Sequence, residues 1–385
     1  MDFTVEEERG MLRKAVRDFV EQEIPRVLAA DLDERRDLPM EIFEKIGAQG
    51  WMGITIDEAY GGSGGDYVDL AIVIEELSRR MAALAFVVAA PVFMCGASIG
   101  RYGTEEQKQK FLPGIASGRD RWCIALTEPG GGTDVLAMKT KATEVAPGRW
   151  KINGSKVFIT GAHLATHMLA VVRTGDGSRK ADGISLFVVD PKAPGVTINH
   201  VPTVGLRAVR TNEVFFDDVE VTADDAVGEI GGAWYKLTET LNAERVIIAA
   251  MAVGVAQAAF EDALEYAKER QIFGKPVGQF QVPQHWLADM NVEIDAARTL
   301  TYRAGWLYSK GLPCHLEAAG AKLFASEVGE RTTRNGMQLM GGHGFTMAHD
   351  MQRYWRDARL FAFAPLNNEM IRSMIGESLG LPRSF

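Results

Sequence analysis

The feature of this 385-residue sequence that most constrains its fold is a hydrophobic period that changes twice. Up to about residue 120, apolar residues recur every three or four positions, which predicts helices over residues 5–24, 39–50 and 67–81. From about Trp122 the pattern becomes short β-rich runs bounded by turn residues. After Gly232 it is helical again to the end. One ordinary core does not grow to this length, so two or three domains are expected.

We therefore predict a mainly α protein with a central β domain. Residues 1–120 are expected to form an α-helical domain. Residues 121–229 are expected to form a small β-barrel or sandwich, because regular short strands with turns are typical of both. The Asn153-Gly154 dipeptide is a hairpin signal within that part. Residues 230–385 are expected to form a helix bundle, with long helices over 237–270, 282–310, 315–340 and 349–375.

The composition argues against several classes of protein. The formal net charge of −9 disfavours a nucleic-acid-binding surface, which needs clustered positive charge. The three cysteines, Cys95, Cys123 and Cys314, are far apart and form neither a metal-binding spacing nor a disulfide framework. The apolar run 87–94 is too short to cross a membrane. The acidic N-terminus has no secretory or transit pattern. A cytoplasmic location is therefore expected, although the mature form of an imported protein would look the same.

A glycine-rich block covers the first expected strand and the turn after it, over residues 122–134. Gly130, Gly131 and Gly132 would let backbone N–H groups approach a ligand closely. The alternative is a tight turn that ends in an Asx cap. A second glycine cluster, at residues 61–65, is interpreted as a plain loop because no Gly-Lys-Ser/Thr follows it.

Glu244 lies near the start of an expected long apolar helix. A carboxylate there would point into a packed interior, and burial would raise its pKa toward the range of a general base. The alternatives are an ion pair with Arg245 and a charge placed near the helix start to interact with the helix dipole.

Six segments carry the chemistry-bearing motifs, at residues 122–134, 157–160, 241–250, 269–281, 338–345 and 353–369. In their order and spacing they resemble the acyl-CoA dehydrogenase family. The resemblance covers essentially the whole chain and implies an N-terminal helical domain, a middle β-barrel and a C-terminal four-helix bundle. It also implies FAD as cofactor and a homo-oligomer, with a tetramer favoured. Within the family, the segment 353–370 is most similar to bacterial carnitine-related members.

The resemblance also implies a role for particular residues. Leu126 and Thr127 would meet the flavin pyrimidine. Thr133, next to Gly132, would meet the pyrophosphate and the substrate's pantetheine arm. The flavin ring would lie against Phe158, Ile159 and Thr160, with the Thr160 hydroxyl bonded to N5. The ADP half of FAD, bound across a subunit interface, would meet Arg270, Phe273 and Gln281. The remaining implied cofactor contacts are Gln338, Gly341, Gly342, Asn367 and Glu369, and the remaining substrate contacts are Asn242 and Arg245.

The implied reaction is α,β-dehydrogenation of an acyl-CoA thioester to the trans-2-enoyl-CoA, with electrons passed to an electron-transfer flavoprotein. Most family members carry the catalytic glutamate where this chain has Pro365. A minority carry it at the position of Glu244, which is therefore the expected base. Proline also lacks the backbone N–H that the family uses there to bind the thioester oxygen. Two alternatives stay open: an enoyl-CoA reductase-like enzyme, and a flavoprotein without dehydrogenase activity that has a scaffold or interaction role.

Overall fold

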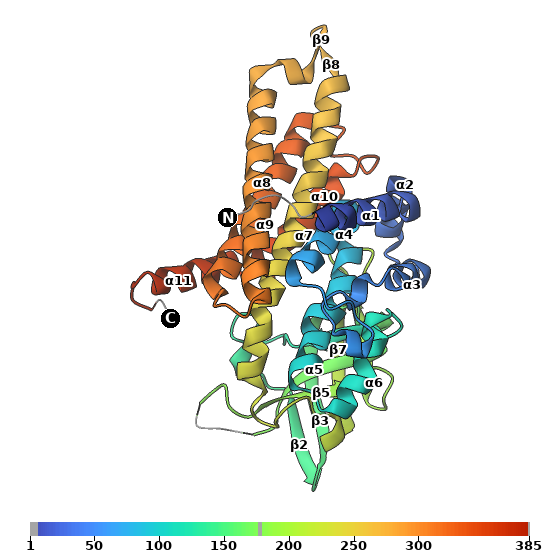
Figure 1. Cartoon of the computed structure of the whole chain (residues 1–385), viewed down its shortest axis with the longest axis vertical. Helices are drawn as coiled ribbons and strands as arrows, with labels where there is room; N and C mark the ends of the chain where they lie inside the picture. Colours follow the sequence, from blue (N-terminus) through green and yellow to red (C-terminus); the bar gives the residue numbers. More distant parts are fainter. Residues whose placement is uncertain (1–6, 176–178, 384–385) are drawn as a thin grey trace.

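The computed structural model describes residues 7–175 and 179–383. It has a helical N-terminal part, a central β-sheet and a long C-terminal helix bundle, as the change of period predicts. The bundle extends along the longest axis, and the β2–β3 hairpin lies at the opposite end of the molecule from β8 and β9 (Figure 1). The N-terminal helices are α1 (Glu7–Glu23), α2 (Arg26–Arg35), α3 (Met40–Ala48), α4 (Tyr67–Ala90), α5 (Ala97–Tyr102) and α6 (Glu105–Ala116).

Helix α4 is the central helix of the N-terminal part. Its start is fixed by a capping box in which Asp66 accepts hydrogen bonds from the backbone of Val68 and Asp69, while Asp69 accepts one from the backbone of Asp66. It is buried on almost every side and packs against α1, α7 and α8. A π-helical turn, Pro91–Gly96, follows it directly.

The central sheet has seven strands in the order β1-β4-β2-β3-β7-β6, with β5 also paired to β4, and it curls around its own apolar core. Its strands are β1 (Trp122–Ala125), β2 (Lys141–Ala146), β3 (Arg149–Thr160), β4 (His167–Arg173), β5 (Ile184–Val189), β6 (Val196–Val201) and β7 (Thr211–Thr222).

The predicted hairpin at Asn153-Gly154 is wrong. The β2–β3 turn lies at residues 147–148, and Asn153 and Gly154 lie inside β3, where the pairing with β7 shifts register. Glycine is needed there for close packing, since a Cβ on Gly154 would lie 2.7 Å from the Cα of Thr140. The Asn153 amide donates to Asp218 across the bulge at 2.9 Å.

The C-terminal bundle is built on α7, which packs against α8, α9 and α10 as well as α4. Two stretches, Tyr67–Tyr102 and Ala233–Glu269, are long and apolar enough to span a membrane by composition, and the first contains the apolar run 87–94. Their apolar windows are 83% and 78% buried within the fold, so internal packing accounts for this composition. The elements are α7 (Ala233–Glu269), β8 (Gln271–Ile272), β9 (Lys275–Pro276), α8 (Gln281–Ser309), α9 (His315–Met340), α10 (Met351–Phe363) and α11 (Asn368–Ser378).

The single helix predicted over residues 349–375 is also wrong, because the chain breaks there into α10 and α11. Pro365 cannot donate a backbone hydrogen bond within a helix. Asn367 then caps α11, its side-chain oxygen accepting a hydrogen bond from the Met370 N–H at 2.8 Å. The break directs residues 364–367 into the space between the bundle and the sheet, where they line a cavity.

Candidate active site

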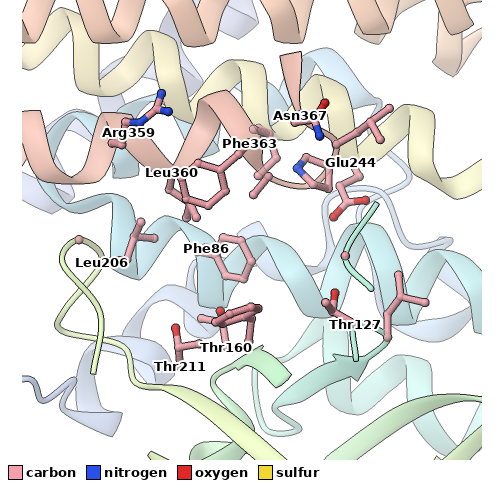
Figure 2. Close-up of a pocket in the computed structure, with 18 of the residues that line it drawn as sticks. Phe86, Thr127, Thr160, Leu206, Thr211, Glu244, Arg359, Leu360, Phe363 and Asn367 are labelled. Atoms are coloured by element: carbon pink, nitrogen blue, oxygen red, sulfur yellow. The ribbon is translucent and has the colours of Figure 1, made fainter. Parts of the chain in front are cut away.

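A cavity of about 1790 Å³ lies between the central sheet and the helices of the bundle. Figure 2 shows Glu244 and Asn367 on one side of it, Thr127, Thr160 and Thr211 on the other, and Phe86 between them. Its volume exceeds the roughly 300–1,000 Å³ of ordinary ligand pockets, so it has room for more than one small ligand. Among the predicted site residues, those that line it are Leu126, Thr127, Gly132, Thr133, Phe158, Ile159, Thr160, Glu244, Arg245 and Asn367.

The end of β3 forms one wall. Phe158 adopts a positive φ of 60° and leaves 63% of its surface exposed. An aromatic residue rarely adopts that conformation, and such strain persists where the surroundings enforce it, often at a ligand site. The pairing of β3 with β7 shifts between Lys156 and Ile159, which explains why the Phe158 ring leaves the sheet. The result is an apolar ring face on the cavity wall, with Thr160 two residues away.

The glycine-rich turn forms a neighbouring wall. A backbone hydrogen bond of 2.9 Å from Val157 to the carbonyl of Thr127 attaches this turn to β3. A Cβ on Gly130 or Gly132 would meet no other atom within 4 Å, so the protein's own packing does not require glycine at either position. Gly132 lines the cavity, and open backbone there suits a closely bound ligand, which favours a ligand-binding turn over a purely structural one.

Glu128 holds this turn in place. Its carboxylate accepts hydrogen bonds from the backbone N–H groups of Lys139 and Thr140 and from the ammonium of Lys156, which is fully buried. Lys156 also donates to the carbonyl of Leu126 at 3.0 Å. Residues 126–128 are therefore held by side-chain hydrogen bonds and an ion pair as well as by the turn itself.

Glu244 is the buried carboxylate of the cavity. It is 8% exposed, and burial raises its pKa to about 7, against the opposing effect of the cations Arg245 and Lys322. α7 begins at Ala233, so Glu244 lies about three turns inside the helix and not near its start as predicted. Arg245 donates to Asn242 at 2.7 Å, and no ion pair joins it to Glu244 in the described part of the chain. Both structural alternatives for Glu244 are therefore disfavoured.

The segment between α10 and α11 lies over the same space. The Asn367 amide donates to the Thr133 hydroxyl at 3.3 Å and so joins this segment to the glycine-rich turn. Pro365 and Leu366 line the cavity beside it. Within residues 7–175 and 179–383, the Leu366 N–H has no hydrogen-bond acceptor, which leaves it free to donate to a ligand.

Other predicted site residues lie away from this cavity. Arg270, Phe273 and Gln281 lie at or beside the β8–β9 turn, at the far end of the bundle from the sheet (Figure 1). Phe273 is 93% exposed there and has a positive φ of 49°. Three further predicted residues, Gln338, Gly341 and Gly342, lie at the C-terminal end of α9. Asn242 on α7 and Glu369 on α11 are also outside the cavity lining.

The cavity also contains residues that the sequence did not single out. Phe86 and Met94 come from α4 and the π-helical turn, and Leu206 comes from the loop before β7. Their apolar side chains are typical of any core, and only the packing of distant elements brings them to this wall. Arg331 and Arg334 reach the cavity from α9 for the same reason.

Three family profiles match the chain in succession. They are those of the acyl-CoA dehydrogenase N-terminal domain over residues 6–119, the middle domain over residues 123–219 and the C-terminal domain over residues 231–380. The chain belongs to the acyl-CoA dehydrogenase family. Members of this family are FAD-dependent oxidoreductases.

Individual relatives match along nearly their whole length. The short-chain specific acyl-CoA dehydrogenase of Clostridium acetobutylicum is 38% identical, and the match covers 94% of each chain. A subunit named CarC of the caffeyl-CoA reductase-Etf complex of Acetobacterium woodii is 35% identical over 92% of this chain and 93% of its own. The structure of butyryl-CoA dehydrogenase from Megasphaera elsdenii superposes with a TM-score of 0.95 at 34% identity, covering 99% of this chain and 100% of that one.

The described residues fit FAD. The cavity is large enough for a flavin together with a thioester, and the exposed Phe158 ring offers a flat apolar surface to a ring system. The open backbone at Gly132, which lines the cavity, offers its N–H group to a phosphate oxygen without an obstructing side chain.

Proposed function

We propose that this protein is an acyl-CoA dehydrogenase in which Glu244 removes the α proton of a short-chain acyl-CoA to give the trans-2-enoyl-CoA. The observation that carries the proposal is the buried carboxylate of Glu244, which lines the cavity and has a pKa raised to about 7. Pro365, at the position of the family's commoner base, lines the same cavity. The short-chain assignment is supported by the names of the Clostridium acetobutylicum and Megasphaera elsdenii relatives.

Glu244 suits this role because a general base works best with a pKa near the operating pH. Burial raises the pKa of Glu244 to about 7, so near neutrality it is both substantially ionised and basic enough to accept a carbon-bound proton. FAD, when bound, supplies the acceptor for the two electrons of the oxidation. Phe158, Thr160 and the glycine-rich turn would hold it, and the walls around Phe86 would exclude water from the reacting carbons.

The thioester oxygen needs a hydrogen-bond donor, because negative charge develops on it as the α proton leaves. Pro365 has no N–H to offer. Leu366 is the next residue along the same cavity-lining segment and has a free N–H, so we assign the donor role to it. This donor is displaced by one residue from the family's usual position, and that displacement would weaken it.

We further propose that a second copy of the chain completes the cofactor site and that the working form is a homo-oligomer, with a tetramer favoured. Arg270, Phe273 and Gln281 lie too far along the bundle to serve the cavity of their own chain. An exposed phenylalanine and an arginine at that tip are suited to the ADP half of an FAD held mainly by a partner.

A second candidate function is reduction of an enoyl-CoA at the same site, with an electron-transfer flavoprotein as electron donor. It is favoured by the relative named as a subunit of a caffeyl-CoA reductase-Etf complex. In the dehydrogenase direction the same kind of protein would be the electron acceptor. Stopped-flow spectroscopy of the flavin tests the direction. Rapid bleaching of the oxidised enzyme by butyryl-CoA supports dehydrogenation. Recolouring of the reduced enzyme by an enoyl-CoA, without bleaching by any saturated thioester, supports reduction.

A further inference from the structure

Lys322 is a buried cation behind the wall of the cavity. Its side chain is completely buried on α9, and lysine is seldom fully buried unless it is paired with a carboxylate. Its ammonium donates to the carbonyl oxygens of Leu366 at 2.7 Å and Ala362 at 3.3 Å, and to the side-chain oxygen of Asn368 at 2.9 Å. All three acceptors are neutral, and within residues 7–175 and 179–383 no carboxylate forms an ion pair with it.

The three acceptors lie on both sides of Pro365. The last backbone hydrogen bond of α10 ends at the Ala364 N–H, and the first of α11 begins at the Asn367 carbonyl. The short segment between them has no helical hydrogen bonds of its own, so the Lys322 ammonium is the group that ties it to the bundle. An ammonium has three donors, and here each has an acceptor on or beside this segment.

The charge of Lys322 also acts on Glu244. Its positive charge, together with that of Arg245, opposes the effect of burial on the pKa of Glu244. Two other carboxylates, Glu369 on α11 and Glu327 on α9, act on Lys322, and burial lowers the pKa of Lys322 to about 8 in spite of them.

We propose that Lys322 is a positioning residue of the active site, which holds the Pro365–Leu366 segment against the cavity and places a fixed positive charge behind Glu244. Three acceptors around one nitrogen need three donors, which an ammonium has and no neutral side chain provides. A buried ammonium without an ion-pair partner suggests that the charge itself is used. The inference rests on the proposed role of Glu244 and extends it from one carboxylate to a carboxylate influenced by a second buried cation besides Arg245.

The test compares Lys322→Met, Lys322→Arg and the exposed control Lys310→Met as FAD-loaded enzymes. The measurements are the limiting rate of anaerobic flavin reduction by butyryl-CoA and the pH midpoint of kcat/KM. Lys322→Met is expected to slow reduction about 10- to 100-fold, because small displacements of active-site groups have effects of that size. It should also raise the midpoint by about one pH unit. Lys322→Arg keeps the charge and should keep the midpoint, and Lys310→Met should change neither quantity.

A second variant keeps the inference testable if Lys322→Met does not fold. Asn368→Asp leaves the lysine in place but puts a carboxylate beside its ammonium, so the midpoint should again rise. Wild-type rate and midpoint in a folded, FAD-containing Lys322→Met, or an unmoved midpoint in Asn368→Asp, would overturn the inference. Failure of the proposed function looks different, because then no saturated acyl-CoA would bleach the unmodified protein either.

Discussion

The side-chain amide of Asn367 donates a 3.3 Å hydrogen bond to the hydroxyl of Thr133 and so bridges two segments that are remote in sequence. Thr133 belongs to the glycine-rich turn of the central β domain, and Asn367 caps α11 at the end of the Pro365 segment. The contact closes the cavity wall near Glu244 and ties the placement of the proposed oxyanion donor to the turn that would hold the cofactor.

The pH dependence of catalysis should follow the ionisation of Glu244. Since burial raises the pKa of Glu244 to about 7, kcat/KM should rise with pH through about that value as the carboxylate becomes a base. The kcat/KM profile is the appropriate measurement because it reports groups of the free enzyme. A profile already flat at pH 5 would show that no base with a raised pKa takes part.

The same ionisation should lower the stability of the folded protein as the pH rises, whereas it raises kcat/KM. The folded-state pKa of Glu244 lies above the usual glutamate value of 4.5, so its neutral form is favoured in the native state. This contribution is fully present below pH 4.5 and is lost as pH rises through about 7. Glu244→Gln should therefore raise the free energy of unfolding at pH 8 by roughly 1–3 kcal/mol. Glu265→Gln, an exposed change on the same helix, is the control, and equal melting temperatures for the two variants would contradict the burial argument.

Replacing Pro365 by alanine should speed flavin reduction. Alanine restores a backbone N–H where the family usually places a donor to the thioester oxygen, and one such donor is worth about 10²–10³-fold in rate when removed elsewhere. Stopped-flow reduction by butyryl-CoA measures the effect, with Pro39→Ala, at the cap of α3, as a remote control. An unchanged rate in Pro365→Ala would mean that the Leu366 N–H, or another group, already provides the full interaction.

Phe158 should matter for cofactor retention. Phe158→Ala removes the exposed ring from the cavity wall, so FAD should dissociate more readily. The positive φ is relieved only in part by alanine, and the fold should persist. The flavin-to-protein absorbance ratio after gel filtration measures this. Phe215→Ala, which removes another partly exposed phenylalanine of the same sheet, should leave the ratio unchanged. Full FAD content in Phe158→Ala would remove this residue from the proposed site.

Arg270 tests whether a second subunit completes the site. It lies far from the cavity of its own chain, so Arg270→Ala can weaken FAD retention only through a neighbouring copy. We expect a lower FAD content, with the sedimentation coefficient of the assembly kept. Lys268→Ala, an exposed change just before the end of α7, is the control. If the protein is monomeric and Arg270→Ala retains FAD, the shared-site proposal is wrong.

The fold could be predicted to a large extent because its three parts differ in hydrophobic period, which depends on local spacing alone. One prediction failed because a tertiary contact overrode a local signal. Asn153-Gly154 has the composition of a tight turn, but the close approach of Thr140 places the glycine inside a strand. The helix expected over residues 349–375 failed for a local reason, because Pro365 interrupts helical hydrogen bonding between α10 and α11.

Parts of the candidate site could be predicted where the residues that mark each part follow one another in a short stretch of sequence. The glycine-rich turn, the end of β3 and Glu244 all meet in one cavity, as the resemblance implied. Lys322 and Phe86 could not be found in this way. A lysine within a helical pattern is normally assigned to the solvent-exposed face, and only the packing of α9 against the Pro365 segment shows that this one is buried.

The measurement that tests the central claim most directly is an anaerobic titration of the purified flavoprotein with saturated acyl-CoAs, starting from butyryl-CoA, for the unmodified protein and for Glu244→Gln. The account predicts bleaching of the flavin absorbance by short-chain thioesters in the unmodified protein. It also predicts a loss of about 10²–10⁴-fold in the reduction rate of Glu244→Gln, which should still contain FAD. Bleaching at an undiminished rate in Glu244→Gln would contradict the assignment of the base. A lack of bleaching by every saturated thioester would contradict the proposed reaction.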